Sequence, residues 1–289
     1  MHGTIIKAVA GFYYVAAGDG MTYQCRARGI FKKQGITPLV GDEAEIEKLD
    51  EEEAVINEIE SRKNEFIRPP VANVDLMAIV ASIESPEPST LVIDRLMVMT
   101  EKADADIILC INKIDLDRGS KAETLKAIYK NIYPVFCVSG MSGNGMPELK
   151  KFLQGRKTAL AGASGVGKST ILNCLAPYAA AQTGGVSRKT DRGKNTTRHV
   201  ELFRMDNGGM VYDTPGFTSL DITGIDAAEL QQMYPEMQEY AGECRYSNCR
   251  HISEPGCAVR EAVEKGKIDR SRYASYLEQH RDIENLKKY

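Results

Sequence analysis

A glycine-rich segment from residue 162 to residue 169 has the composition of a phosphate-binding loop. Its sequence, GASGVGKS, fits the pattern G-x-x-x-x-G-K-S between an expected strand over 158–161 and an expected helix. We expect Lys168 to contact the β- and γ-phosphates and Ser169 to bind Mg²⁺. A glycine-rich turn with an exposed lysine is the alternative, which the flanking elements disfavour. The residues expected to bind the nucleotide are Gly162, Ala163, Ser164, Gly165, Val166, Gly167, Lys168, Ser169 and Thr170.

The tetrapeptide Asn112–Asp115, with the sequence NKID, follows an expected strand over 106–111 and has the residues of a guanine-reading motif. The Asp115 carboxylate can accept hydrogen bonds from the N1–H and 2-amino groups of guanine. Adenine offers no such pair of donors, which disfavours ATP as the ligand. The residues expected at the base are Asn112, Lys113, Ile114, Asp115 and, on a turn whose alternative role is purely structural, Ser139 and Gly140.

Two further segments carry groups that could sense a γ-phosphate. Asp213-Thr-Pro-Gly216 follows an expected strand over 210–212, so Asp213 can hold Mg²⁺ through water and the Gly216 N–H can face the phosphate. The hydroxyl of Thr196 or Thr197 would bind Mg²⁺; we expect Thr197, which precedes Arg198, and with Lys168 it forms the expected catalytic set. Phe217 stands where Ras-like enzymes place a water-orienting glutamine, so hydrolysis must use another group or one that a partner positions.

The segment 183–204 is rich in Gly, Thr and basic residues, and we expect a loop that leads into a strand over 200–204. Its six basic residues outnumber its two acidic ones, which suits contact with RNA phosphates. A solvated loop without a partner is the alternative. The basic residues are Arg188, Lys189, Arg192, Lys194, Arg198 and Arg204.

Three cysteines and one histidine lie within a short segment near the end of the chain. Three thiolates and one imidazole form a complete tetrahedral ligand set for Zn²⁺, with no open position for catalysis. We therefore expect a structural zinc site with about one ion per chain, and disulfides are the alternative. The expected ligands are Cys244, Cys249, His251 and Cys257.

Three regions are expected to position these groups. Residues 1–68 show short alternating strands, which predict an OB-type β-barrel that binds RNA, with a generic structural barrel as the alternative. Two prolines at 69 and 70 are expected to block regular structure and mark a boundary. Residues 69–220 alternate strands and helices, which predicts a doubly wound sheet with ligand loops at the strand carboxyl ends. Residues 221–289 predict a helical zinc-binding region, including a charged helix over 258–288, so the fold class is multidomain α/β.

The 289-residue chain has a net charge of −3, so nucleic-acid contacts must come from local patches. Its 43% hydrophobic content is ordinary for a globular protein with a core. The N-terminal sequence lacks the pattern of a secretory signal, and no run approaches the ~18 apolar residues of a membrane span. We therefore expect reduced cysteines, a cytoplasmic location and no membrane partner.

The order of the motifs is unusual, because the guanine-reading motif precedes the phosphate-binding loop. Ordinary GTPases have the reverse order. The rotated order, together with the Cys-Cys-His-Cys pattern, makes the chain resemble the circularly permuted GTPases of the bacterial RsgA family, also called YjeQ or YloQ. The resemblance covers essentially the whole chain and extends to the segments Arg62–Asn64, Ala72–Asp75 and Asp94-Arg95. It implies an OB-type barrel, a permuted P-loop GTPase domain and a zinc domain.

The resemblance also implies a GTP hydrolase that acts in late maturation of the 30S ribosomal subunit. Such a protein, expected to be a monomer, would bind the subunit and its 16S rRNA with GTP. Hydrolysis stimulated by the subunit would leave GDP and release the protein. Family members often carry a histidine two residues before the Mg²⁺-binding threonine, where this chain has Asn195. Asparagine cannot exchange a proton with water, so a GTP-dependent RNA-binding module with negligible turnover is the alternative.

Overall fold

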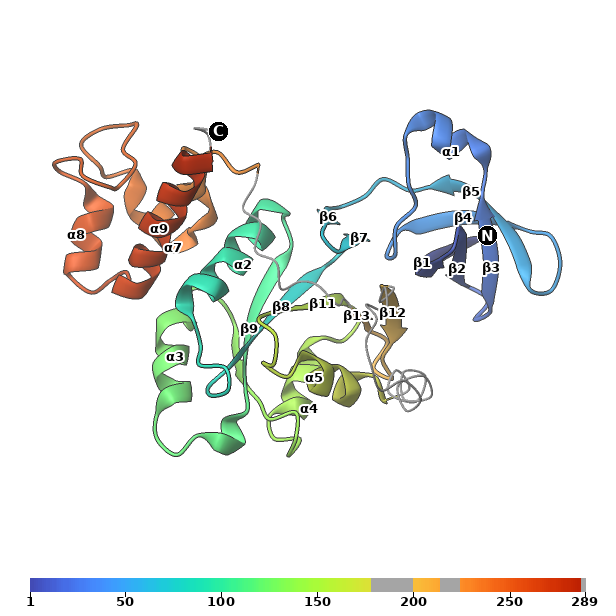
Figure 1. The fold of residues 1–289 in the computed structure, drawn as a ribbon, viewed down its shortest axis with the longest axis horizontal. Helices are drawn as coiled ribbons and strands as arrows, with labels where there is room; N and C mark the ends of the chain where they lie inside the picture. Colours follow the sequence, from blue (N-terminus) through green and yellow to red (C-terminus); the bar gives the residue numbers. More distant parts are fainter. Residues whose placement is uncertain (178–199, 214–223, 287–289) are drawn as a thin grey trace, which may run out of the picture.

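The computed structural model describes residues 1–177, 200–213 and 224–286. A β-barrel, a sheet covered by helices and a helical region follow one another along the chain (Figure 1). The barrel and the helical region lie on opposite sides of the central sheet (Figure 1). Within the described residues, no helix is long and apolar enough to cross a membrane.

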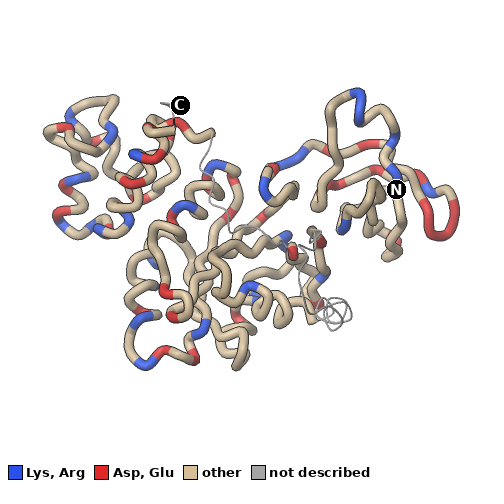
Figure 2. Tube along the Cα trace, viewed as in Figure 1, with Lys and Arg blue, Asp and Glu red and all other residues tan. Residues whose placement is uncertain are grey.

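The N-terminal region forms a closed barrel with the strand order β1-β2-β3-β5-β4, in which β4 pairs back onto β1. Alternate side chains such as Ile5, Val15 and Ile56 point inward and fill the interior. This pairing confirms the predicted OB-type barrel. Acidic residues gather in the turn between β4 and β5 (Figure 2). The strands are β1 (His2–Val9), β2 (Phe12–Ala17), β3 (Thr22–Ala27), β4 (Glu43–Lys48) and β5 (Glu53–Ile59), and a short helix α1 (Gly29–Gln34) that was not expected joins β3 to β4.

A short hairpin connects the barrel to the central sheet. Strands β6 (Glu65–Ile67) and β7 (Pro70–Ala72) pair antiparallel, with Ile67 opposite Pro70. The expectation that the two prolines block regular structure was therefore wrong. Pro70 is tolerated because it is the first residue of a strand at the edge of a two-stranded sheet, where its missing N–H donor costs nothing.

The central sheet has the strand order β10-β9-β8-β11-β13-β12. Its first five strands are parallel, as predicted, whereas β12 runs antiparallel to β13. A single pairing of Lys7 with Glu201 joins β12 to β1 of the barrel. The strands are β8 (Leu76–Ser82), β9 (Asp106–Asn112), β10 (Val135–Cys137), β11 (Lys157–Ala161), β12 (Glu201–Arg204) and β13 (Met210–Asp213).

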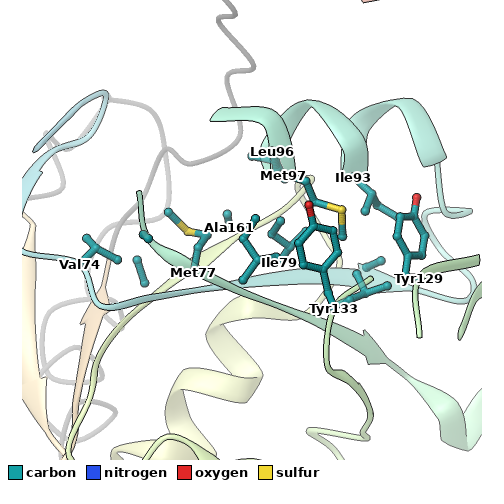
Figure 3. Close-up of a cluster of buried hydrophobic side chains, with 14 of the residues drawn as sticks. Val74, Met77, Ile79, Ile93, Leu96, Met97, Tyr129, Tyr133 and Ala161 are labelled. Carbon is teal, nitrogen blue, oxygen red and sulfur yellow. The ribbon is translucent and has the colours of Figure 1, made fainter. Parts of the chain in front are cut away.

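Helices cover both faces of this sheet because its central strands are apolar on both sides. Met77 and Ile79 of β8 face one core, where Ile93 and Met97 of a helix pack on them (Figure 3). The residues between them along β8 face the opposite core. The first face is covered by α2 (Thr90–Lys102) and α3 (Lys121–Tyr129), and the second by α4 (Met146–Phe152) and α5 (Lys168–Leu175).

The C-terminal region is helical and has its own apolar core, to which Val98 of α2 contributes. The single charged helix predicted over 258–288 is instead two helices, with a left-handed Gly266 in the turn between them. The last helix packs along α2 (Figure 1). The elements are η2 (Leu230–Met233), α7 (Pro235–Ala241), α8 (Ala258–Glu264) and α9 (Arg270–Leu286).

A buried ion cluster joins the helical region to the sheet domain. The Arg272 side chain is fully buried on α9 and donates to Asp94 of α2 at 2.6 Å and to Glu236 of α7 at 2.7 and 3.0 Å. The Tyr129 hydroxyl also donates to Asp94 at 2.9 Å. Burial raises the pKa of Asp94, while the charge of Arg272 acts in the opposite direction. The guanidinium therefore compensates two carboxylates on two other helices.

Replacing Arg272 with methionine should strongly destabilise this junction. The variant leaves the fully buried Asp94 carboxylate and the largely buried Glu236 carboxylate without their counter-charge, so we expect the free energy of unfolding to fall by about 3–5 kcal/mol. Urea denaturation followed by circular dichroism measures this change. Arg250→Met is the matched control, because Arg250 is half exposed beside Glu284 and should cost under about 1 kcal/mol. An equally small fall in the free energy of unfolding for both variants would contradict the role of Arg272 as the counter-charge of Asp94 and Glu236.

Candidate nucleotide and metal sites

The predicted nucleotide-binding residues lie on loops that leave the carboxyl ends of parallel strands. Asn112 ends β9 and residues 113–115 follow it, Ser139 follows β10, the glycine-rich loop follows β11, and Asp213 ends β13. Because these strands are parallel neighbours in one sheet, their carboxyl ends share one edge. The sheet therefore brings together residues that are far apart in the sequence.

The glycine-rich loop wraps around the start of α5, which begins at Lys168. The Lys168 ammonium donates to the carbonyls of Gly162 at 2.7 Å and Ala163 at 2.8 Å. Burial lowers the pKa of Lys168, so a nearby anion would restore the preference for its charged form. Ser164 and Ser169 are exposed, which leaves the loop open on its outer side.

The Asn112 side chain links three of these loops. Its amide nitrogen donates to the Val166 carbonyl at 2.8 Å, and its amide oxygen accepts from the Gly140 N–H at 3.1 Å. The side chain is buried, so both bonds are sheltered from water. Residue 167 must be glycine, because a Cβ there would lie 2.2 Å from the Asn112 nitrogen and its φ is +97°. Asn112 thus fixes the base-side loops against the phosphate-side loop.

Lys113 and Asp115 face different surroundings. Lys113 has a left-handed φ of 65°, and its ammonium donates to the Gly165 carbonyl at 2.8 Å and to the Ser85 carbonyl. Asp115 is exposed and makes no hydrogen bond or ion pair with any other described residue. Ile114 is held beside the residue that follows β10, because its N–H donates to the Val138 carbonyl at 3.3 Å. The carboxylate is therefore available to a ligand.

The second base-side turn packs on the helix that follows the glycine-rich loop. Ser139 is buried, and its hydroxyl accepts from the Ser142 N–H at 3.1 Å. A Cβ at Gly140 would lie 3.0 Å from the Thr170 methyl group, so the turn and α5 are in close contact. The Cys174 thiol donates to the Gly140 carbonyl at 3.2 Å. This turn is thereby fixed next to segment 112–115.

Two of the three predicted Mg²⁺ ligands lie in the described part of the chain, and the third lies outside it. Ser169 lies in the first turn of α5, and Asp213 is half-buried at the end of β13, the next strand in the sheet after β11. Thr197 and Gly216 lie outside the described residues, as do Asn195 and Phe217. The side chains of Ser169 and Asp213 end in oxygen atoms, the kind of ligand atom that Mg²⁺ prefers.

The four predicted metal ligands converge in the helical region. The ligand atoms of Cys244, Cys249, His251 and Cys257 all lie within 4.8 Å of one another. His251 Nδ1 lies 3.6 Å from the Cys244 sulfur and 3.3 Å from the Cys257 sulfur. In a tetrahedron with metal–sulfur bonds of about 2.3 Å, the edges are about 3.8 Å. The cluster could therefore hold a tetrahedral metal ion.

The chemistry of these cysteines also fits a metal. All are free, and the Cys244 and Cys257 sulfurs are 4.0 Å apart, well beyond the roughly 2.05 Å of a disulfide. Burial raises the pKa of Cys249 to about 12, so the thiolate would form only together with a compensating cation. The disulfide alternative is therefore disfavoured by geometry.

Side chains outside the predicted set hold the ligand segment. The side-chain amide oxygen of Gln231, on η2, lies 2.6 Å from His251 Nε2. This contact sets the ring so that Nδ1 faces the sulfurs. The Tyr273 and Tyr276 hydroxyls donate to the carbonyls of His251 and Arg250 at 2.6 and 2.7 Å. No local sequence pattern predicts these roles, because Gln231, Tyr273 and Tyr276 are all distant from the ligand segment along the chain.

Comparison with protein families identifies two matches. Residues 2–56 match the RsgA N-terminal domain, and residues 59–223 match the RsgA GTPase. A small ribosomal subunit biogenesis GTPase RsgA of Caldanaerobacter subterraneus subsp. tengcongensis is 44% identical over 289 residues, which cover 100% of this chain and 97% of the relative. The protein of the same name from Geobacillus kaustophilus is 46% identical over 279 residues, which cover 95% of this chain and 94% of the relative.

Two solved structures share the fold. YjeQ from Thermotoga maritima has a TM-score of 0.86 and 34% identity over 98% of both chains. YloQ, a circularly permuted GTPase, has a TM-score of 0.84 and 38% identity over 99% of this chain and 95% of that one. In this chain β9, which precedes the NKID motif, likewise comes before β11, which precedes the glycine-rich loop. This protein therefore belongs to the RsgA family of circularly permuted GTPases.

Proposed function

We propose that this chain binds and hydrolyses GTP as a switch in late maturation of the small ribosomal subunit. The observation that carries the proposal is the buried Asn112 side chain, which holds the base-side loops and the phosphate-side loop together at one sheet edge. The name of the relatives, small ribosomal subunit biogenesis GTPase, supports the same process.

In this proposal the exposed Asp115 carboxylate reads guanine, because it has two acceptor oxygens and no described partner. The hydrocarbon stem of Lys113 covers the base while its ammonium stays on the Gly165 carbonyl. Ser139 and Gly140 form the opposite wall of the base site. Selectivity for guanine over adenine then follows from the cost of leaving the Asp115 carboxylate unpaired.

The phosphates would lie over the glycine-rich loop. Lys168 can exchange the Gly162 and Ala163 carbonyls, to which it donates, for the β- and γ-phosphate oxygens. Ser169, Thr197 and Asp213 would hold Mg²⁺, which neutralises charge on the β- and γ-phosphate oxygens. The Gly216 N–H would face the γ-phosphate. The backbone N–H groups of residues 162–170 complete the cradle.

Hydrolysis in this proposal is gated by the partner. Lys168 would stabilise the charge that develops on the transferred phosphoryl group, and Thr197 would be one of the residues that hold Mg²⁺. Neither Phe217 nor Asn195 can remove a proton from water. The subunit would therefore complete the site by ordering a water or supplying a charged group. GDP would remain after the reaction and favour release.

The partner surface would be the 16S rRNA of the 30S subunit. In the barrel, residues 20–41 contain four basic residues, Arg26, Arg28, Lys32 and Lys33, and no acidic one. Lys32 and Lys33 are exposed on α1. The basic segment 188–198 would add further phosphate contacts. We place the protein in the cytoplasm as a monomer, where the subunits that it would bind are assembled.

We propose that the metal cluster binds one structural Zn²⁺ ion. Three thiolates and one imidazole are the soft and borderline ligands that Zn²⁺ prefers, and all four positions are filled by the protein. Cys249, His251 and Cys257 are buried, so no position is open to a substrate. The ion would hold segment 244–257 in place beside α9.

Purified 30S subunits should accelerate GTP turnover by this protein. Groups supplied by a partner are worth about 10³-fold or more in comparable enzymes, so we expect a rise of at least roughly tenfold in phosphate release. Lys168→Ala is the control and should remain inactive with and without subunits. Turnover that is the same in the presence and absence of subunits would overturn the proposed function.

Replacing Asp115 with asparagine should change the base that is recognised. The amide can donate to the 2-oxo group of xanthine and no longer pairs with both donors of guanine. We expect GTP affinity to fall by about 10²-fold or more and xanthosine triphosphate to bind preferentially. Titration with fluorescent nucleotides measures this. Asp117→Asn is the matched control, because the Asp117 carboxylate accepts from the backbone N–H groups of Gly119 and Ala122. Unchanged nucleotide selectivity in Asp115→Asn would refute the assignment of Asp115 to guanine recognition.

Removing the Gln231 side chain should weaken zinc binding. Loss of a group that orients a ligating histidine typically lowers metal affinity by about 10–100-fold. We expect this loss for Gln231→Ala in a competition titration between the protein and a chromophoric chelator. Gln238→Ala is the matched control, because the Gln238 amide donates to the Gln231 backbone carbonyl and not to the histidine. Equal zinc affinities for the two variants would count against the role of Gln231.

A further inference from the structure

Tyr212 is a fully buried residue on β13, directly before Asp213. Its hydroxyl donates to the carbonyl of Ala72 at 2.7 Å, in the hairpin that connects the barrel to the sheet. Burial, with smaller effects from Asp75 and Glu43, raises the pKa of Tyr212 far above its usual range, so the hydroxyl keeps its proton. The Tyr212 side chain thus connects β13, the strand that ends at Asp213, to the hairpin.

The alternation of the strand separates Tyr212 from Asp213. Tyr212 belongs to the core under α2, whereas Val211 belongs to the core under α5. Side chains two residues apart share a face, so Asp213 points to the side of α5, where Ser169 lies. A tether on one face of β13 therefore sets the position of a carboxylate on the other face.

Tyr212 is also the last residue of β13 that pairs with β11. The pairing of β13 with β11 ends at Ala159 opposite Tyr212, and the next residue, Asp213, pairs with Glu201 of β12. The Tyr212 hydroxyl bond to Ala72 therefore anchors β13 at the residue directly before Asp213.

The acceptor of this bond is itself fixed by the barrel. A Cβ at Gly41 would lie 2.1 Å from the Ala72 oxygen and 2.2 Å from the Tyr212 hydroxyl, so only glycine permits this approach. The Gly41 carbonyl accepts from Lys157 at 3.1 Å, at the start of the strand that leads to the glycine-rich loop. Gly41 of the barrel therefore contacts both β13, through Tyr212, and β11, through Lys157.

We propose that Tyr212 is a positioning residue for the reaction, and that its hydroxyl holds Asp213 at the Mg²⁺ site by tethering β13 to strand β7 of the connecting hairpin. The inference rests on the role proposed above for Asp213. It goes beyond that role because it assigns a function to a residue that would contact neither nucleotide nor metal. A purely structural tyrosine would affect stability and leave the Mg²⁺ requirement unchanged.

Tyr212→Phe removes only the hydroxyl and tests this directly. The Mg²⁺ concentration that gives half-maximal GTP turnover should rise about fivefold, the factor that one net hydrogen bond is worth. The KM for GTP at saturating Mg²⁺ should stay unchanged. Tyr133→Phe is the matched control, because it also loses a well-buried hydroxyl, here bonded to Glu101 at 2.8 Å at the opposite edge of the sheet. An Mg²⁺ requirement that is the same in both variants would overturn the proposal.

A second pair of variants displaces the tether from the barrel side. Gly41→Ala pushes on the hydroxyl and on its acceptor, and should raise the Mg²⁺ requirement at least as much as Tyr212→Phe. Gly11→Ala has a similar positive φ of 82° with no atom within 4 Å of the added Cβ, and it controls for backbone strain. If Gly41→Ala and Gly11→Ala have the same Mg²⁺ requirement, the contact of Gly41 with Tyr212 and Ala72 does not position Asp213. Should Gly41→Ala fail to fold, the Tyr212→Phe comparison still decides the question.

Asp213→Asn separates this inference from the function on which it rests. This variant should raise the Mg²⁺ requirement far more than Tyr212→Phe does. If Asp213→Asn leaves the requirement unchanged, the proposed Mg²⁺ role of Asp213 fails and the tether has nothing to position. If Asp213→Asn raises it while Tyr212→Phe matches the wild type, the positioning role alone fails.

Discussion

The candidate nucleotide site depends on the two hydrogen bonds of the Asn112 side chain. Circular permutation changes which loop comes first in the chain, but it leaves the order of parallel strands in the sheet intact. The loops still need a cross-link at the sheet edge, and one buried amide bonds to Val166 on one side and to Gly140 on the other. Lys113 adds a second link to Gly165. Spatial neighbourhood, and not chain order, defines this site.

The helical metal region is tied to the same domain by a second buried polar centre. Arg272 of α9 compensates Glu236 of α7 and Asp94 of α2, and α2 is the helix that follows β8. The loop between β8 and α2 contains Ser85, whose carbonyl accepts from Lys113. A continuous set of contacts therefore runs from the base-side loop to α9.

Much of this arrangement could be predicted from local patterns. The apolar strands, the glycine-rich loop and the Cys/His spacing are local signals, and each appears in the structure at its expected place. What could not be predicted depends on distant partners. Arg272 looks like one more charge on a charged helix, and only the fold places Asp94 and Glu236 around it. Pro70 was misjudged because strand tolerance for proline depends on whether the strand lies at an edge.

The central claim is that these loops form one guanine-selective site despite the permuted order. Calorimetric titration of the wild-type protein with GDP and with ADP, both with Mg²⁺, tests it most directly. The account predicts saturable binding of GDP at about one site per chain and affinity for ADP that is lower by about 10²-fold or more, because the Asp115 carboxylate would lack its donors. Equal affinities for GDP and ADP would contradict it.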